Sequence, residues 1–590
     1  MSVRQGLDLS RRTGNRYHVH MDSTLAAQPL AAPLSDPLYY LRNFRSVLAW
    51  LAARYDDLLD AEERAFLRDF GTLPDASQGL LVRLIMRRGI HFRLQRLAYA
   101  ELGDSRAAAA PLQALGWLRH DAPLGAGTLA SLLTRDELIA LLATGPEGTS
   151  TIALRRLRKP ALAALLDERS DGEASFADWC QGTPGLVNET LLSLTVMPLC
   201  ERLRLMFFGN LYQDWSTFVL TELGHHRFVP VPLHPEARAF RTRADIDIAV
   251  ALASSRDTLA AEGGPEKAVA QLPPPPTLPW LQARHARLLC RFGQAFERHQ
   301  QPARALACYA ASDTPEARVR QVRALERLGQ HRHALRLARQ RLLDPPDDET
   351  ALQLQRIVPR LCRKTGDVRP APTPDADLPV QRITLPPPTA DANARVEHAA
   401  ALALAAREPD SEVHYVENAL LPGLFGLLCW PALFHPVPGA FFHPFQDGPA
   451  DLRDPDFASR RHEDFARCLA ALDDGRHRDL ILHRYREYAG LRNPFVIWPV
   501  LSEPLLELAL SCIPASHLRA VFQRLLRAPD RYRAGFPDLI QFWPSEQRYA
   551  LIEIKGPGDR LQDHQQRWLS FFCQQGIPAR VCHVQWATSP

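Results

Sequence analysis

The chain has 590 residues, of which 46% are hydrophobic and 23% charged, and its formal net charge at pH 7 is +4. This length predicts about three to five domains, and the weak net charge excludes a uniformly basic nucleic-acid binder, so any DNA surface must be a local patch. None of the ten cysteines form a Cys-x-x-Cys pair, which argues against structural zinc, and no apolar run is long enough to span a bilayer. We therefore expect reduced, mostly buried thiols in a cytoplasmic protein.

The first part of the chain predicts a tail followed by a helical module. Residues 1–36 are polar and then rich in Ala and Pro, which is typical of a disordered tail. In residues 37–110 apolar residues recur at helical spacing, and we expect a helical DNA-binding domain. Basic residues interleaved with aromatic ones end its third helix and suit a phosphate backbone; they include Arg83, Arg87, Arg88 and Arg93. A solvated arginine face is the alternative.

Residues 111–170 predict a helix–loop–helix. Thr134 and Glu137 have the spacing of a capping box, and a Gly/Thr-rich segment separates the two helical patterns. This segment resembles the SAP motif, a two-helix DNA-binding element. Four basic residues fall where the second helix should begin, and there the helix dipole would also favour phosphate: Arg155, Arg156, Arg158 and Lys159. A helical hairpin without a ligand remains the alternative.

The middle of the chain predicts a scaffold. Residues 171–272 form a helical, aromatic-rich connector, in which Arg243 is a further candidate phosphate contact. Leu289, Gly293 and Tyr309 fall at the offsets of a tetratricopeptide-like helix pair, so we expect helical repeats over 281–365. Two imperfect copies are too few to be stable alone and must pack on their neighbours. Residues 366–395 have the composition of a Pro-rich linker.

The last module, residues 396–590, opens with a helix that we expect to be capped by Ser411. On this helix Glu417 falls within an apolar stripe that contains Val413 and Leu421. Burying a carboxylate is costly unless the carboxylate is paired or binds a metal. Glu417 is therefore either a metal ligand or half of a buried ion pair.

Two β-rich runs around Pro544-Ser-Glu-Gln predict a hairpin. In the second run Glu553 and Lys555 point to one face, and Asp538 opens the first run near the same end. Two carboxylates and a lysine suit hydrolysis of a phosphodiester with Mg²⁺ or Mn²⁺, which polarises the phosphate and activates water. An exposed hairpin with a cross-strand ion pair is the alternative. A helix carrying Gln565 and a final strand complete an α/β core with a small mixed sheet.

The phrase Glu553-Ile-Lys-Gly-Pro-Gly-Asp-Arg-Leu, followed by Gln565-x-x-Trp568, resembles the virus-type replication-repair nuclease domain of the PD-(D/E)xK superfamily. In the front half, Leu38-Tyr-Tyr-Leu-Arg-Asn-Phe and Phe207-Phe-Gly-Asn resemble phrases of the Fanconi-associated nuclease family. The order of modules also resembles that family in its bacterial form.

The resemblance implies a mostly α, multidomain nuclease with Asp538, Glu553 and Glu417 as metal ligands and Lys555 as the catalytic lysine. It also implies a helper role for Gln565 and a metal-binding backbone carbonyl at Ile554. The implied cofactor is Mg²⁺ or Mn²⁺, and the implied partner is branched or 5′-flap DNA, with no membrane. The implied activity is 5′-flap endonuclease and 5′-to-3′ exonuclease cleavage in DNA repair, including repair of interstrand crosslinks, in the bacterial cytoplasm at the nucleoid. A four-way junction resolving nuclease and a non-catalytic DNA-binding adapter are the alternatives.

Overall fold

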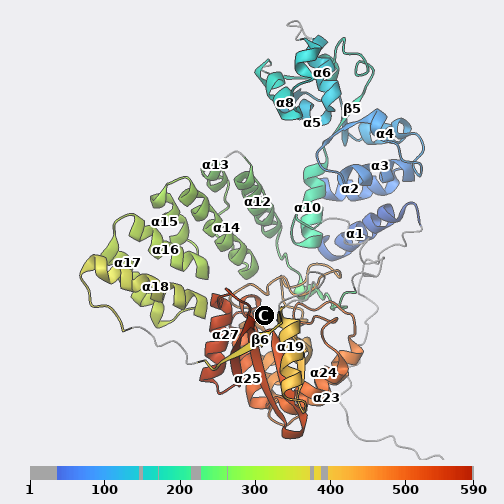
Figure 1. The fold of residues 1–590 in the computed structure, drawn as a ribbon. Coiled ribbons are helices and arrows are strands. Elements are labelled where there is room, and N and C mark those ends of the chain that lie inside the picture. The colour runs from blue at the N-terminus through green and yellow to red at the C-terminus, as the bar shows by residue number, and fades with distance from the viewer. Residues whose placement is uncertain are drawn as a thin grey trace, which may run out of the picture.

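The computed structural model describes residues 36–144, 150–169, 172–213, 227–261, 264–371, 378–386 and 396–587. Apart from Asp36, the expected disordered tail lies outside these ranges. The described elements are mainly helices, and two arms of helices rise from a C-terminal module that holds a small sheet (Figure 1). The predicted multidomain, mostly α architecture is confirmed.

The first module is a helical layer closed by a small sheet. Its helices are α1 (Tyr39–Tyr55), α2 (Ala61–Thr72), α3 (Asp75–Ile85) and α4 (Ser105–Ala114). β1 (His91–Arg93), β2 (Leu118–His120) and β5 (Leu191–Leu194) form an antiparallel sheet in the order β1-β5-β2. Asp60 and Glu63 form a capping box that starts α2, so the local sequence fixes where this helix begins.

The next module lies at the tip of the N-terminal arm and has a hydrophobic core of its own. Its elements are β3 (Leu124–Gly125), α5 (Ala126–Leu132), α6 (Arg135–Thr144), α7 (Thr151–Leu154), α8 (Lys159–Glu168), β4 (Glu173–Ala174) and α9 (Phe176–Trp179). The predicted capping box is present, because the Glu137 backbone N–H donates to Thr134 and the Thr134 N–H donates to Glu137 at 2.7 Å. The second main helix, α8, begins at Lys159 with Arg158 as its N-cap, so the basic cluster lies where this helix begins, as expected.

The helical repeats form the second arm. α10 (Met197–Phe208) lies beside α1 in the N-terminal arm (Figure 1). α12 (Arg243–Ala260) and α13 (Gly264–Ala270) lead into the repeat helices, which are α14 (Pro279–Arg298), α15 (Pro302–Ala310), α16 (Pro315–Arg327), α17 (His331–Leu343) and α18 (Asp348–Thr365). Gly293 is required where α14 meets α15, because a Cβ atom there would lie 2.4 Å from the ring of Tyr309. The tetratricopeptide-like offset of these two residues therefore marks a close helix crossing.

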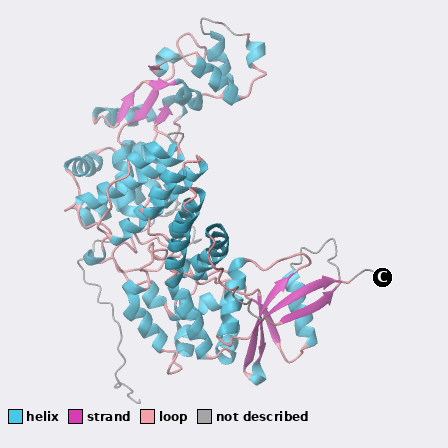
Figure 2. Ribbon diagram, turned by 90° about the vertical axis from the view of Figure 1, so that its left-hand side faces the viewer, coloured by secondary structure: helices cyan, strands magenta, loops and turns pink. Residues whose placement is uncertain are grey.

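The C-terminal module wraps helices around a mixed five-stranded sheet in the order β6-β10-β9-β8-β7 (Figure 2). The strands are β6 (Val380–Leu385), β7 (Glu412–Tyr415), β8 (Leu539–Trp543), β9 (Arg548–Lys555) and β10 (Ala579–Trp586). The helices are α19 (Val396–Arg407), α20 (Leu420–Leu428), α21 (Trp430–Leu433), α22 (His462–Ala470), α23 (His477–Glu487), α24 (Glu503–Cys512), α25 (Ala515–Arg527), α26 (Pro529–Tyr532) and α27 (Asp563–Gln574). β6 and β9 flank β10 in parallel, whereas β8 pairs antiparallel with β9 and with β7.

Two expectations for this module were wrong in part. The range 366–395, expected to be a linker, contains β6, which pairs with β10 over six residues. The helix expected to begin at Ser411 is instead β7, which pairs with β8, and α20 begins only at Leu420. In both cases a partner strand far along the chain decides the conformation, and such pairing overrides local periodicity.

Nine of the ten cysteines are buried free thiols, and Cys573 on α27 is exposed. The expectation of mostly buried, unpaired cysteines is confirmed. Among the described helices, no single one has the length and apolarity needed to cross a membrane, and only the sharply bent pair α24 and α25 meets those criteria jointly.

Candidate active site

The predicted hairpin is present and presents the acidic residues to the interior. β8 and β9 pair antiparallel, and Gln547 turns the chain between them with a φ of 49°. Ile552 and Ile554 pack into the core beneath α19, whereas Leu551 packs into the larger core on the other face. Glu553 and Lys555 share the face of Leu551, as the alternation along β9 predicts.

Asp538 and Glu553 form a buried carboxylate pair. Asp538 precedes β8 and is 7% exposed, and one of its oxygens accepts the backbone N–H of Ile554 at 2.8 Å. Glu553 is fully buried, and neither of its carboxylate oxygens has a hydrogen-bond partner of good geometry. Burial raises the pKa of Glu553 to about 7, and the neighbouring charge of Asp538 raises it as well. Burial likewise raises the pKa of Asp538 to about 6, against the lowering effect of the Ile554 hydrogen bond.

Lys555 is held between a carboxylate and an amide. Its Nζ lies 2.8 Å from Oε1 of Glu553 and donates to Oε1 of Gln565 at 3.0 Å. Gln565 is the third residue of α27, and its Oε1 also accepts the backbone N–H of Gln562 at 3.0 Å, which closes a capping box. The same amide oxygen therefore begins the helix and orients the lysine.

Glu417 lies in the turn between β7 and α20 and not on a buried helical stripe. The residues on either side of it are pinned to the segment before Asp538: the Val416 N–H donates to the Asp538 carbonyl at 2.8 Å, and Asn418 Oδ1 accepts the N–H groups of Gly535 and Phe536. This places Glu417 beside Asp538, where its negative charge contributes to the raised pKa values of both buried acids.

The carboxylate of Glu417 is exposed and accepts hydrogen bonds from the Tyr415 hydroxyl and, at 3.2 Å, from Asn418. Among the residues that the structure describes, no three His, Cys, Asp or Glu side chains are grouped closely enough to hold an ion. The predicted convergence of all three acids on one point is thus absent from this arrangement. The unpartnered Oε2 of buried Glu553, beside Asp538, still fits a hard divalent cation, which compensates buried carboxylates.

One acidic residue near the site was missed. Glu397 lies in the first turn of α19, and its charge is among the causes that raise the pKa of Asp538. Its sequence context, an Ala-rich amphipathic helix, is the same as that of an ordinary solvent-exposed glutamate, so nothing in the sequence singles it out.

Three of the predicted DNA-binding arginines are held by carboxylates within the protein. Arg93 is only 4% exposed and pairs with Glu189 and, at 2.8 Å, with Glu137. Arg83 lies 2.5 Å from Glu101 and over the ring of Tyr40. Arg243 contacts Asp60, Glu63 and Asp247 at 2.9, 2.6 and 3.1 Å. Arg93 and Arg243 join the first module to later segments, and Arg83 is held within the first module, so these guanidinium groups are occupied by protein carboxylates where a phosphate contact was expected.

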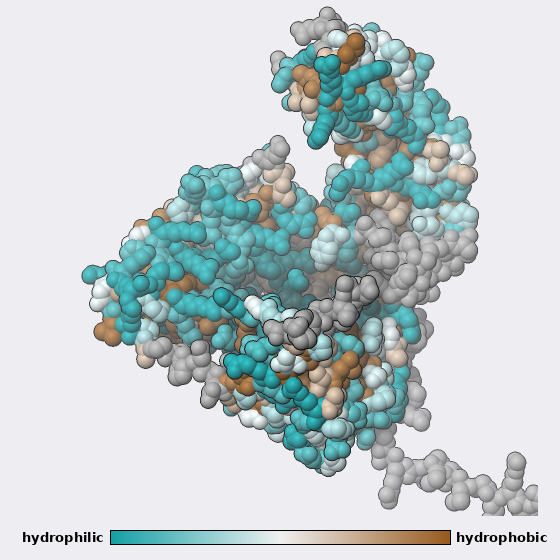
Figure 3. Space-filling model, viewed as in Figure 1, coloured by the Kyte–Doolittle hydropathy of each residue, from teal (hydrophilic) through white to brown (hydrophobic). Residues whose placement is uncertain are grey.

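The other predicted basic residues reach solvent. Arg87 and Arg88 are exposed after α3, and Arg155, Arg156 and Arg158 are exposed before α8, where Lys159 is half-buried. Both groups lie on the N-terminal arm. Figure 3 shows that the molecule is hollowed between this arm and the helical repeats, and that hydrophilic residues cover much of the hollow.

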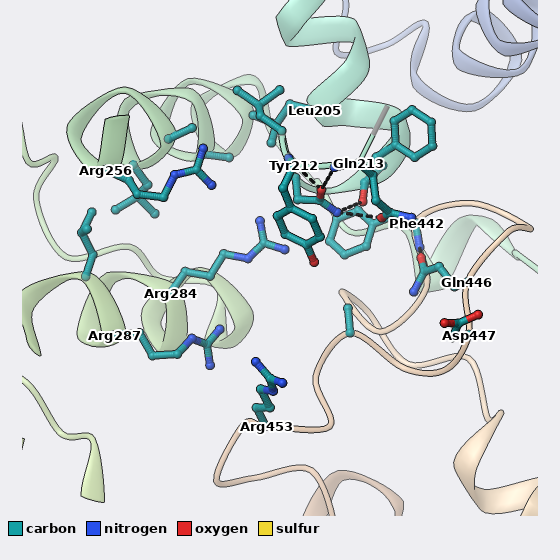
Figure 4. A pocket seen from close by; sticks show the side chains of 18 of the residues that line it. Leu205, Tyr212, Gln213, Arg256, Arg284, Arg287, Phe442, Gln446, Asp447 and Arg453 are labelled. Atoms are coloured by element: carbon teal, nitrogen blue, oxygen red, sulfur yellow. Dashed lines mark hydrogen bonds between the residues drawn. The ribbon is translucent and has the colours of Figure 1, made fainter. Parts of the chain in front are cut away.

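A basic cavity of about 590 Å³, which the sequence analysis missed, lies between α10, α12, α14 and the loops after α21. Arg284, Arg287, Arg453 and Arg256 point toward it from three segments (Figure 4). Arg287 and Arg453 also pair with Asp454 and Asp530. Arg284 donates to the Gly209 carbonyl and lies 4.6 Å from the Trp280 ring, and burial lowers its pKa to about 10. Arginines dispersed over three segments leave no local sequence signal.

Three family models match the chain. The FAN1 HTH domain matches residues 38–119, the Fanconi anemia-associated nuclease SAP domain matches 123–179, and the VRR-NUC domain matches 472–586. The first two cover the N-terminal arm, and the third covers β8, β9, α27 and β10.

Comparisons over the whole chain also find Fanconi-associated nucleases. The chain is 45% identical to the Fanconi-associated nuclease 1 homolog of Pseudomonas aeruginosa, over 95% of this chain and 98% of that protein. It is 25% identical to the homolog of Arabidopsis thaliana, over 93% of this chain and 67% of that protein. Its structure is similar to the crystal structure of paFAN1 bound to 5′-flap DNA with a 2-nucleotide flap and a gap, with a TM-score of 0.85 and 45% identity over 95% of this chain and 100% of that chain.

Proposed function

Since the chain belongs to the Fanconi-associated nuclease family, and is therefore a structure-selective nuclease of DNA repair, we propose that Asp538, Glu553 and Glu417 form its cation site. The observation that carries this proposal is the fully buried Glu553, whose Oε1 is paired with Lys555 at 2.8 Å whereas its Oε2, with Asp538 as a neighbouring charge, has no hydrogen-bond partner. Two neighbouring buried carboxylates with a single lysine between them and solvent are unusual outside functional sites. The backbone carbonyl of Ile554, between Glu553 and Lys555, is the further ligand that we propose.

The cation is Mg²⁺ or Mn²⁺, since both prefer oxygen ligands, and when bound it supplies Lewis acidity toward the scissile phosphate. Glu417 completes the ligand set when its carboxylate leaves the Tyr415 hydroxyl. Lys555 places a positive charge at the phosphate and offsets charge that develops as the P–O bond breaks. Gln565 holds the amine of Lys555 in place through the 3.0 Å hydrogen bond.

The substrate that we propose is a 5′ flap or another branched DNA, and the reactions are endonucleolytic cleavage near the junction and 5′-to-3′ exonucleolytic cleavage, including at interstrand crosslinks. The solved relative binds 5′-flap DNA. In this chain, exposed arginines on the N-terminal arm face solvent, and they suit the phosphates of a duplex arm. The cavity around Arg284 suits a phosphate from a strand near the junction, since buried guanidinium groups bind phosphate strongly.

The test is cleavage of a 5′-labelled flap duplex with Mg²⁺ or Mn²⁺, in parallel with Glu553→Ala and Lys555→Ala. We expect cleavage by the wild type and a loss of at least about a hundredfold in each variant. Flap binding should persist, because affinity comes mainly from remote phosphate contacts. Cleavage that survives Glu553→Ala, or that is unaffected by a chelator, would refute the proposed site. Mapping products on four-way junctions separates flap cleavage from junction resolution.

A further inference from the structure

The nuclease module docks on the last repeat helix, α18, through ion pairs. Three acidic residues at the start of α18 contact arginines of the nuclease module: Asp347 lies 2.8 Å from Arg531, Asp348 lies 2.6 Å from Arg524, and Glu349 lies 3.8 Å from Arg567. The Asp348 N–H also donates to the Tyr532 hydroxyl at 2.9 Å. α18 therefore touches α25, α26 and α27. Of these helices, α26 leads into the segment that contains Asp538, and α27 carries Gln565.

Further along α18, one ion pair is reversed: the arginine lies on α18 and the carboxylate lies on the nuclease module. The guanidinium of Arg356 meets the carboxylate of Asp563 in a bidentate pair at 2.7 and 2.8 Å, and it bridges 207 residues of sequence. Asp563 is the first residue of α27, and Gln565 follows two residues later. A change in the position of Asp563 therefore shifts the helical turn that contains Gln565, the residue whose Oε1 accepts a hydrogen bond from Lys555.

We propose that Arg356 is a positioning residue for DNA cleavage: by holding Asp563 it fixes the first turn of α27, and through Gln565 it fixes the amine of Lys555. This inference rests on the proposed catalytic role of Lys555. It makes the helical repeats part of the catalytic machinery, because the correct placement of the lysine depends on a residue outside the nuclease module.

The contact between Arg356 and Asp563 is better suited to fixing the orientation of α27 than to raising the free energy of unfolding. The side chains of Arg356 and Asp563 are 53% and 55% exposed, and exposed pairs contribute little to the free energy of unfolding. The planar guanidinium nevertheless fixes the orientation of a carboxylate through two parallel hydrogen bonds. Small displacements of a catalytic group cost activity steeply, so a weak contact has a measurable effect on turnover.

The experiment measures kcat and KM for flap cleavage by the full chain. We expect Arg356→Ala to lower kcat roughly fivefold with KM, flap affinity and the thermal midpoint unchanged. Asp563→Asn should give a similar loss, because it removes the negative charge and one of the two acceptors of the bidentate pair while keeping a hydrogen-bonding side chain at the start of α27. The double variant should lose no more than either single one, and Arg356→Lys should recover part of the loss.

Arg360→Ala is the matched control. Arg360 lies one turn further along α18 and pairs with Glu326 inside the repeats at 2.6 and 2.8 Å, so its removal changes charge equally without touching the nuclease module. An unchanged kcat in Arg356→Ala, additive losses in the double variant, or a change confined to KM would each overturn the inference. Lys555→Ala in the same assay separates this failure from failure of the proposed site, which would leave that variant active.

Discussion

At the scale of single residues, the burial of Asp538 and Glu553 shapes the chemistry of the site and also lowers the stability of the fold. Glu553 and Asp538 carry raised pKa values because burial disfavours their charged forms. Without a cation, the folded protein holds protons on these groups that the unfolded chain would have lost. The free energy of unfolding should therefore fall as pH rises from the unfolded pKa values, near 4, through about 7.

Glu553→Gln tests this effect. The folded pKa of Glu553 is raised from 4.5 to about 7, so the ionised wild-type residue destabilises the fold at pH 8 and scarcely does so near pH 5. In the presence of a chelator, we expect the variant to be more stable than wild type at pH 8, with an advantage on the order of 2 kcal/mol larger than at pH 5. Scanning calorimetry at the two pH values measures the difference.

The matched control is Glu546→Gln, which changes an exposed glutamate on the turn of the same hairpin. It should show no pH-dependent gain in stability. A Glu553→Gln variant that is equally stable or less stable than wild type at pH 8 would show that burial of this carboxylate costs the fold nothing.

At the scale of elements, the turn between β7 and α20 holds Glu417 beside the hairpin that β8 and β9 form. Asn418 adopts a φ of 51°, and its single oxygen accepts two backbone N–H groups, those of Gly535 at 2.7 Å and Phe536 at 3.0 Å. Gly535 itself has a φ of 95°, and a Cβ atom there would meet the His564 carbonyl at 2.9 Å. Glu417 thus owes its position to contacts made by its neighbours.

Asn418→Ala removes the shared acceptor and leaves both N–H groups without a protein partner. We expect a loss of about 1–3 kcal/mol in the free energy of unfolding and a lower apparent affinity for Mn²⁺ in cleavage, because Glu417 shifts relative to Asp538. Asn418→Asp keeps an oxygen acceptor and tolerates a positive φ, so it should retain most of the stability. Calorimetry and a Mn²⁺ titration of cleavage measure both effects; equal behaviour of the two variants would contradict the assigned role.

What could be predicted at this scale was local. Alternation along β9, the turn at Pro544 and the capping box at Thr134 all depend on neighbouring residues, and the sequence revealed each of them. β7 could not be predicted, because Val413 and Leu421 also fit a helical stripe, and only pairing with β8 decides between the two. The role of Arg93 could not be predicted either, because its carboxylate partners are 44 and 96 residues away in sequence.

At the scale of the whole molecule, a net charge of +4 is too small for the surface as a whole to attract DNA, so DNA binding depends on local basic patches. We propose that the exposed arginines before α8 form one such patch; they lie at the tip of the N-terminal arm, far from the nuclease module (Figure 1). Their contribution should therefore be to affinity and not to the rate of the chemical step.

The double change Arg155→Ala with Arg156→Ala tests this separation. We expect weaker flap binding, a slope of log affinity against log salt that is smaller by about one to two, and an unchanged kcat at saturating DNA. Arg548→Ala, which removes an exposed arginine at the end of β9 opposite Lys555, should change neither quantity. Fluorescence anisotropy at several salt concentrations provides the slopes; identical slopes for wild type and the double variant would rule out phosphate contacts at these arginines.

The solvent-facing sulfur of Cys573 gives this molecule a natural attachment point. Maleimide dyes react with accessible thiols, and the other nine cysteines are buried. Cys573 lies near the end of the helix that begins with Asp563 and carries Gln565. A single fluorophore could therefore be coupled there without engineering, and its emission would report in real time how that helix responds when a flap arrives.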